Sequence, residues 1–139
     1  MQATGIIFLT KKTKRILYLL RNPQKSFPLT WCFPGGKIEH NETVVQGLDR
    51  EIYEEVGEIP NILYSFYINT YSNESKSFTF HTFLGIIEDE FIPHISDEHI
   101  GYCWCDMDRF PKPIHPKIRN IFQNKILMKD IHFLLDNLD

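Results

Sequence analysis

Residues 31–57, which decide the fold, read WCFPGGKIEHNETVVQGLDREIYEEVG. The stretch opens with the short β-type segment Trp31 to Phe33. Pro34-Gly35-Gly36 follows and predicts a turn, because glycine adopts backbone conformations that other residues avoid. Strand, turn and helix are therefore expected in this order.

The helix has start and stop signals of its own. Thr43 and Gln46, three residues apart, match a capping box, and Gly57 is the residue type that commonly ends a helix. An apolar stripe at helical spacing predicts the buried face: Val45, Leu48, Ile52 and Val56.

Outward from this stretch, the chain alternates between strand and helix patterns. Apolar, β-branched and aromatic runs predict one hairpin on each side and a later strand: Ala3–Leu9 with Arg15–Leu20, Ile62–Tyr71 with Phe78–Ile87, and Gly101–Cys105. A last helix is expected from about Lys117, with a core face of Ile131, Leu134, Leu135 and Leu138. The order predicts an α/β fold, a mixed β-sheet between helices in an α/β/α sandwich.

Length and composition fit one folded domain over residues 1–139. The chain is 42% hydrophobic and 24% charged, which disfavours disorder. Its net charge of −3 gives no overall basic field for a nucleic acid polymer or an acidic membrane. The longest apolar run near the start is far shorter than the ~20 residues that span a bilayer. Three cysteines cannot all pair within one chain, which favours a reducing, cytoplasmic compartment.

Five carboxylates are concentrated between Gly35 and Gly57, and only Lys37 and Arg50 oppose them locally. The five are Glu39, Glu42, Glu51, Glu54 and Glu55. The last three stand at i, i+3 and i+4 and converge on one helix face, where each like-charge pair costs about 0.2–0.5 kcal/mol even in water. A shared divalent cation reverses the sign of this repulsion, and oxygen ligands suit Mg²⁺ or Mn²⁺. The alternative is a solvated acidic helix face.

These residues resemble the signature of the Nudix hydrolases from Gly36 to Gly57. Five residues separate Gly36 from Glu42, seven more precede Arg50-Glu51, and Glu54-Glu55-Val56-Gly57 completes the pattern. The chain departs from the family at Glu58, where an aliphatic residue is preferred, and at Gly47, where alanine is usual. Neither departure removes a carboxylate, and Gly47 is expected to leave space beside the metal site.

The resemblance implies a role for each position. Glu54 and Glu55 are expected to coordinate metal, with the Gly35 carbonyl as a further ligand and Glu51 as ligand or general base. Arg50 is expected to clamp the carboxylates, a task that suits a guanidinium fork. Glu39, Glu42 and Gly36 support the site, and Lys37 contacts a phosphate or is a solvated surface lysine.

The implied activity is that of an Mg²⁺-dependent pyrophosphohydrolase, with Mn²⁺ as a substitute. Water attacks phosphorus in a nucleoside diphosphate linked to another moiety, as in a dinucleoside polyphosphate, nucleotide sugar, dinucleotide cofactor or modified nucleoside triphosphate. The partner is then a small nucleotide rather than a membrane or a nucleic acid polymer, and a homodimer remains open. Two alternatives are an RNA 5′-end decapping hydrolase and a nucleotide-sensing module without catalysis.

Further candidates lie outside the signature. Glu98, in the loop Asp97-Glu98-His99, is a candidate general base in place of Glu51, and Arg21, at the end of the second strand, is a candidate substrate contact. Five aromatic residues are candidates to stack a base, each with core packing as the alternative: Tyr18, Phe33, Tyr71, Phe80 and Trp104. The six histidines show no paired metal spacing and are interpreted as ordinary polar residues.

Overall fold

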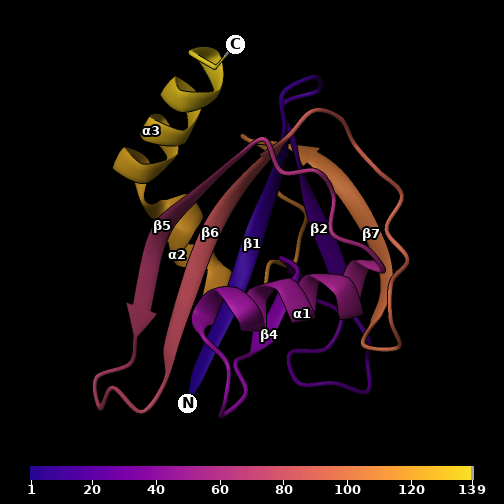
Figure 1. Cartoon of the computed structure of the whole chain (residues 1–139), viewed down its shortest axis with the longest axis vertical. Coiled ribbons are helices and arrows are strands. Elements are labelled where there is room, and N and C mark those ends of the chain that lie inside the picture. Colours follow the sequence, from indigo (N-terminus) through magenta and orange to yellow (C-terminus); the bar gives the residue numbers. More distant parts are fainter. Residues whose placement is uncertain (139) are drawn as a thin grey trace.

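The computed structural model describes residues 1–138, and it confirms a mixed sheet with helices (Figure 1). Its elements are β1 (Gln2–Thr10), β2 (Arg15–Arg21), β3 (Trp31–Cys32), β4 (Gly35–Lys37), α1 (Val44–Val56), β5 (Tyr64–Ser72), β6 (Thr79–Ile87), β7 (His99–Asp106), α2 (Pro116–Gln123) and α3 (Lys125–Asp136). Both predicted hairpins are present, since β1 pairs antiparallel with β2 and β5 pairs antiparallel with β6. The described helices include none long and apolar enough to cross a membrane.

The centre of the sheet is β1, whose residues are buried from Ala3 onward. One edge of β1 pairs with β6 in parallel along its whole length. The other edge is divided: β2 pairs with it at Leu9, and β4 pairs with it from Ala3 to Gly5. β1 and β2 therefore separate away from their turn, and β4 lies in the opening between them. Along β2 the neighbour is β7, which pairs with it antiparallel.

The predicted turn at Pro34-Gly35-Gly36 is only partly correct, because Gly35 and Gly36 begin strand β4. The Pro34 carbonyl accepts a hydrogen bond from Ile6 N–H at 3.0 Å, and Gly35 pairs with Gly5. A Cβ on Gly35 would lie 2.1 Å from the Thr4 carbonyl oxygen. Glycine is needed here because the chain passes so close to β1.

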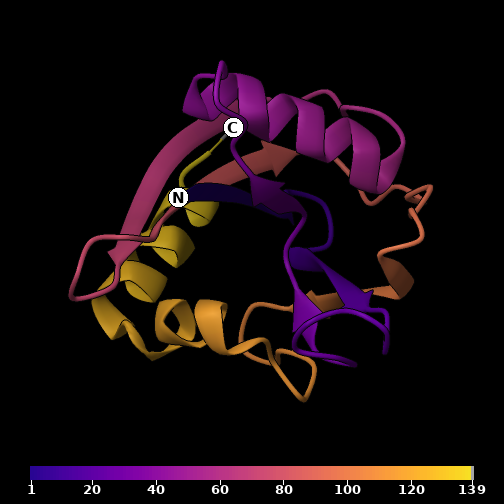
Figure 2. The ribbon, with the colours of Figure 1, turned by 90° about the horizontal axis from the view of Figure 1, so that it is seen from below.

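Each face of the sheet has its own hydrophobic core and its own helices (Figure 2). Helix α1 covers one face, where Leu48, Ile52 and Val56 are buried. Helices α2 and α3 cover the other face through four buried residues: Ile118, Ile121, Ile131 and Leu135. The α/β/α sandwich expected from the order of elements is thus confirmed.

Helix α1 follows its predicted signals closely. The Thr43 side chain accepts from Gln46 N–H, the Gln46 side chain accepts from Thr43 N–H, and the helix ends at Gly57. The prediction for Val45 is wrong, since this side chain is 56% exposed while Val44 packs against the core. The first turn of α1 thus directs Val44 rather than Val45 towards the sheet.

The predicted last helix is two helices, which is a second correction. Asn124 has an extended backbone, with φ −83° and ψ 92°, and ends α2. Its side chain accepts from Leu127 N–H at 3.0 Å and so caps the start of α3. A residue that caps well also competes with helical hydrogen bonding, and this competition divides the segment. Ile131 and Leu135 are buried as predicted, whereas Leu134 and Leu138 are half-buried.

Candidate active site

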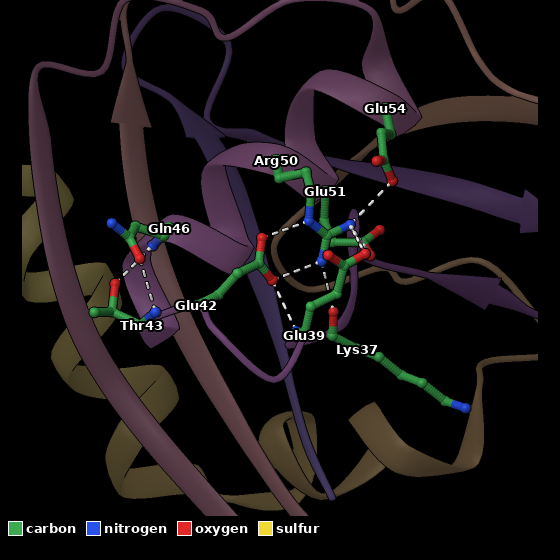
Figure 3. A network of polar contacts seen from close by, with 8 residues as sticks. All are labelled: Lys37, Glu39, Glu42, Thr43, Gln46, Arg50, Glu51 and Glu54. Atoms are coloured by element: carbon green, nitrogen blue, oxygen red, sulfur yellow. Dashed lines mark hydrogen bonds and ion pairs between the residues drawn. The ribbon is translucent and has the colours of Figure 1, made fainter.

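Arg50 lies at the centre of a carboxylate cluster on α1 and the turn before it (Figure 3). Its guanidinium binds Glu42 with two hydrogen bonds, from Nε at 2.6 Å and from Nη2 at 2.9 Å. Nη1 donates to Glu51 at 3.0 Å and to Glu54 at 3.2 Å. We refer to Arg50 and its carboxylate neighbours Glu39, Glu42, Glu51 and Glu54 as the Arg50 cluster. Arg50 therefore makes the contacts with several carboxylates that the clamp prediction requires.

The outer members of the Arg50 cluster hold the turn after β4. The hydrogen bonds from Arg50 and from Glu39 N–H lower the pKa of Glu42 to about 2. Arg50 Nη2 also donates to the Lys37 carbonyl at 2.9 Å, while the Lys37 ammonium points away from the cluster (Figure 3). The Glu39 carboxylate is exposed and lies 3.8 Å from Arg50. Glu42 is thus the carboxylate that anchors Arg50, and Glu39 is peripheral.

Glu51 turns inward from α1 and lies against β4. A Cβ on Gly36 would come within 2.5 Å of the Glu51 carboxyl carbon, so only glycine leaves room for this carboxylate. Burial raises the pKa of Glu51 although Arg50 lowers it, and the charges of Glu54 and Glu98 raise it further. A carboxylate with a raised pKa is a better proton acceptor near neutral pH.

Glu55 is the most deeply buried carboxylate of the signature, 3% exposed. Its Oε1 accepts a hydrogen bond from Gly35 N–H at 2.6 Å, and its Oε2 lies 3.5 Å from His99 Nδ1. Burial raises the pKa of Glu55 well above its usual range, and the charges of Glu51 and Glu98 raise it further. Glu98 therefore lies near the α1 carboxylates, although the loop that carries it is more than forty residues further along the chain.

The three carboxylates of α1 do not all point to one place. Glu51 and Glu55, one helical turn apart, face β4, whereas Glu54 is exposed and directed at Arg50. Within residues 1–138, no three His, Cys, Asp or Glu side chains already stand as a set of metal ligands. Mg²⁺ and Mn²⁺ accept waters and substrate phosphates among their ligands, so a complete protein cage is not required. The donor chemistry fits such an ion, because the charge of Glu98 raises the pKa of both Glu51 and Glu55 and all three side chains offer only oxygen atoms.

A cavity of about 190 Å³ lies beside β4, whose Gly35, Gly36 and Lys37 are among its lining residues, whereas no α1 residue is. Three cationic side chains line it, Arg21, Lys37 and Lys117, and the first two are candidate substrate contacts from the sequence. Four phenylalanines also line it: Phe27, Phe33, Phe78 and Phe80. The cavity thus combines positive charge with aromatic rings next to the backbone that supports Glu51 and Glu55.

The structure places some of the candidate stacking rings at the cavity and the others elsewhere. Phe33 and Phe80 line the cavity, but Tyr18 is fully buried in the core and Trp104 packs edge-on against Phe91. Tyr71 is exposed on β5 and is not part of the cavity. Tyr18, Tyr71 and Trp104 therefore lie away from the cavity.

Sequence reasoning missed several cavity residues because their neighbours come from distant segments. The Lys117 ammonium lies 4.2 Å from the centre of the Phe78 ring, and the ring centres of Phe27 and His115 are 4.5 Å apart. His115 is no ordinary surface residue, since its Nδ1 accepts from Lys117 N–H and caps α2. His99 is likewise buried, and burial together with Arg21 lowers its pKa to about 4. Neither histidine has a local signal in the sequence.

Gly47 does not leave the free space that was expected beside the metal site. A Cβ on Gly47 would lie 3.2 Å from Glu42 Oε1 and 3.2 Å from an Ile38 side-chain carbon. The turn after β4 therefore packs directly on this part of α1, and the small residue lets the turn approach the helix.

Comparison with known proteins agrees with this arrangement. The family model of the NUDIX domain matches residues 1–125. An "8-oxo-dGTP diphosphatase" of Buchnera aphidicola from Acyrthosiphon pisum is 32% identical over 122 residues, which are 84% of this chain and 95% of that protein. A protein of the same name from the Schizaphis graminum strain is 40% identical over 60 residues, 41% of this chain, and the match spans about half (45%) of that relative's length. A Nudix hydrolase from M. smegmatis, RenU, superimposes with a TM-score of 0.77 at 18% identity over 99% of this chain and 89% of its own.

Proposed function

Because the chain belongs to the Nudix family, hydrolases that act on phosphoric anhydride bonds and generally use divalent metal ions, we propose that it is an Mg²⁺-dependent pyrophosphohydrolase of a small nucleotide. The observation that carries the proposal is the cavity described above. It places cationic and aromatic side chains against Gly35 and Gly36, whose other side contacts Glu55 and Glu51.

The cavity combines two kinds of side chain, cationic and aromatic, that suit the phosphates and the base of a nucleotide. Arg21, Lys37 and Lys117 offer positive charge to phosphate oxygens. Phe27, Phe78 and Phe80 offer flat faces to a base, since every base presents a π-face. With net charge −3 on the whole chain, this local positive charge favours a small ligand over an RNA chain.

The acidic side of β4 supplies the chemistry of hydrolysis. We assign Glu51, Glu54, Glu55 and the Gly35 carbonyl to the metal ion, with Arg50, Glu42, Glu39 and Gly36 holding them in place. When bound, the ion neutralises pyrophosphate charge and makes an attacking water more acidic. Glu51 or Glu98 accepts the water proton, a P–O bond forms to the water oxygen, and the bridging P–O bond breaks. The products are two phosphate-bearing fragments.

Among the candidate substrates, we propose a nucleoside triphosphate with a modified base as the first to test. Both curated relatives carry the name 8-oxo-dGTP diphosphatase. Cleavage would then give a modified nucleoside monophosphate and pyrophosphate.

The test is a substrate panel with Mg²⁺, with Mn²⁺ and with EDTA. It contains 8-oxo-dGTP, dGTP, a nucleotide sugar, a dinucleoside polyphosphate and a capped RNA, and chromatography resolves the products. Metal-dependent cleavage of one small nucleotide is expected, and hydrolysis in ¹⁸O-labelled water identifies the attacked phosphorus. The Glu51→Gln variant controls for a contaminating phosphatase.

Two outcomes would overturn the proposal in different directions. Preferred cleavage of the capped RNA would make the protein a decapping hydrolase. Absence of cleavage, together with a nucleotide-induced rise in melting temperature, would make it a nucleotide-sensing module.

A further inference from the structure

We propose that His99 positions the Glu55 carboxylate and that Cys32 orients the His99 ring. The three side chains form a relay behind the candidate active site, with Cys32 on β3, His99 at the start of β7 and Glu55 on α1. The inference rests on the proposed function, because it concerns a residue assigned there to the metal ion. It adds two residues that lie outside the Nudix signature.

The two ring nitrogens of His99 face the other two side chains, Nδ1 towards Glu55 and Nε2 towards Cys32. His99 Nδ1 lies 3.5 Å from Glu55 Oε2, and His99 Nε2 lies 3.6 Å from Cys32 Sγ. The side chains of His99 and Glu55 are 1% and 4% exposed. Among residues 1–138, His99 Nδ1 is one of the few buried side-chain atoms without a hydrogen-bond partner. A buried ring nitrogen left unpaired is costly, and the Glu55 carboxylate is the acceptor that faces this one.

The order of donors along the relay follows from the groups themselves. A carboxylate that binds a cation is ionised and only accepts hydrogen bonds, so in that state the His99 ring donates from Nδ1 to Glu55. Nε2 of the neutral ring is then an acceptor. The Cys32 thiol faces two acceptors, this nitrogen at 3.6 Å and the Leu19 carbonyl at 3.5 Å, and it orients the ring when its proton is directed at Nε2. Burial raises the pKa of the Cys32 thiol to about 12, so the thiol keeps its proton. Cys32 is therefore an orienting donor and not a reactive nucleophile.

The relay fixes the second oxygen of Glu55. Oε1 is already held by Gly35 N–H at 2.6 Å, and His99 supplies the corresponding donor for Oε2. A carboxylate held at both oxygens keeps a defined orientation and retains a lone pair on each oxygen for a cation. Loss of a side chain that hydrogen-bonds to a metal ligand commonly weakens metal binding by about 10–100-fold.

Two members of the relay, Cys32 and His99, also line the cavity. The relay therefore connects the wall of the nucleotide site to a carboxylate on the acidic side of β4. A merely structural histidine in the core would make no such connection.

The experiment measures Mn²⁺ binding by calorimetry, without nucleotide and without turnover. We expect His99→Phe, which keeps a ring but removes both nitrogens, to weaken Mn²⁺ binding by about 10–100-fold. His99→Asn should restore most of it, because its amide nitrogen is attached to Cγ as Nδ1 is. Cys32→Ala should have a smaller effect in the same direction. His132→Phe is the matched control, since His132 is on α3 and contacts Asp108.

A second measurement determines which ring nitrogen of His99 carries the proton. ¹⁵N shifts of the His99 ring in the wild-type protein should show a proton on Nδ1 and none on Nε2. The opposite tautomer would overturn the inference, as would Mn²⁺ affinity in His99→Phe equal to that of the wild type, or failure of His99→Asn to restore it. Wild-type protein that binds Mn²⁺ but cleaves no nucleotide would instead count against the proposed function alone.

Discussion

At the scale of single residues, the site depends on one arginine among like charges. Arg50 contacts Glu42, Glu51 and Glu54 and the carbonyl of Lys37 through three nitrogens of one planar group. A lysine carries the same charge but has no fork to bind two partners at fixed angles. Arg50 therefore acts as an internal counter-ion that keeps the carboxylates together before any cation binds.

Removal of this counter-ion should destabilise the protein in a metal-dependent way. In EDTA, we expect Arg50→Gln to lower the free energy of unfolding by about 2 kcal/mol, because hydrogen bonds to charged groups are lost and the carboxylates repel. Mg²⁺ should recover part of the loss. Urea denaturation with and without Mg²⁺ measures both effects, and Arg119→Gln on the exposed side of α2 is the control. Equal stability of Arg50→Gln and wild type would contradict the assigned role.

Glu54 allows a test of catalysis apart from stability, because its side chain is half exposed and, within residues 1–138, Arg50 is the partner that holds it. We expect Glu54→Gln to reduce kcat/KM by about 100-fold or more, as for loss of a metal ligand. Its melting temperature should be equal to or above that of the wild type, since one of several like charges is removed. Steady-state kinetics and thermal unfolding test this beside Glu58→Gln, two residues past the end of α1. A variant that unfolds would make Glu54 a structural residue.

At the scale of elements, the loop from β6 to β7 brings a distant carboxylate to α1. The Glu98 carbonyl accepts from Asn22 N–H at 2.9 Å, and the Asp97 carbonyl accepts from the Asn22 side chain at 2.9 Å. These bonds fix the loop to the end of β2. They explain how Glu98 influences the pKa of both Glu51 and Glu55.

If Glu98 is the general base, Glu98→Gln should lower kcat by about 100-fold while KM changes little. Asp97→Asn, in the same loop, is the matched control, because only the backbone carbonyl of Asp97 is used in the bond to Asn22. Unchanged kinetics of Glu98→Gln would return the role of base to Glu51. A comparable loss in Asp97→Asn would instead indicate a general effect on the loop.

The other end of the same loop gives a prediction on pH. Arg15 on β2 binds Glu90 with two hydrogen bonds of 2.7 Å, and the arginine lowers the pKa of Glu90. The pair therefore stabilises the fold above the ordinary glutamate pKa of about 4.3 and loses this contribution as pH falls through the lower folded value. Glu90→Gln should be less stable than wild type at neutral pH, and the difference should disappear in acid. Thermal unfolding across this range measures it, with Glu74→Gln as control, and a difference independent of pH would exclude the pair as its source.

At the scale of the whole molecule, local sequence rules predicted most helices and strands but not which of them lie next to one another. Helix α1 was predictable with its cap and end, because a capping box and a terminal glycine act within a few residues. The strand β4 was read as a turn, because its pairing partner β1 lies thirty residues away and only the close approach at Gly35 reveals the need for glycine. The carboxylates of the site were recognised from one continuous stretch.

The cavity could not be predicted in the same way, since the whole fold assembles it. Lys117 from α2 meets Phe78 from the turn before β6, and His99 from β7 meets Glu55 from α1. No spacing rule connects such pairs, because the parallel pairing of β1 with β6 and the packing of α2 decide them. Arg21 and Lys37 became candidates only because Arg21 ends a strand and Lys37 lies within the recognisable stretch.

A site built from so many elements should respond as a unit when nucleotide binds. With 8-oxo-dGTP in EDTA at about 100 times its Kd, we expect the free energy of unfolding to rise by about 2.7 kcal/mol. Amide exchange should slow in α2 and in residues 22–30, which carry Lys117 and Phe27, and remain unchanged in α3. Lys117→Ala should weaken nucleotide binding, whereas Lys129→Ala on the exposed side of α3 should not. Protection confined to α1 would place the nucleotide on the acidic side of β4, because the cavity residues that α2 supplies would then be without a ligand.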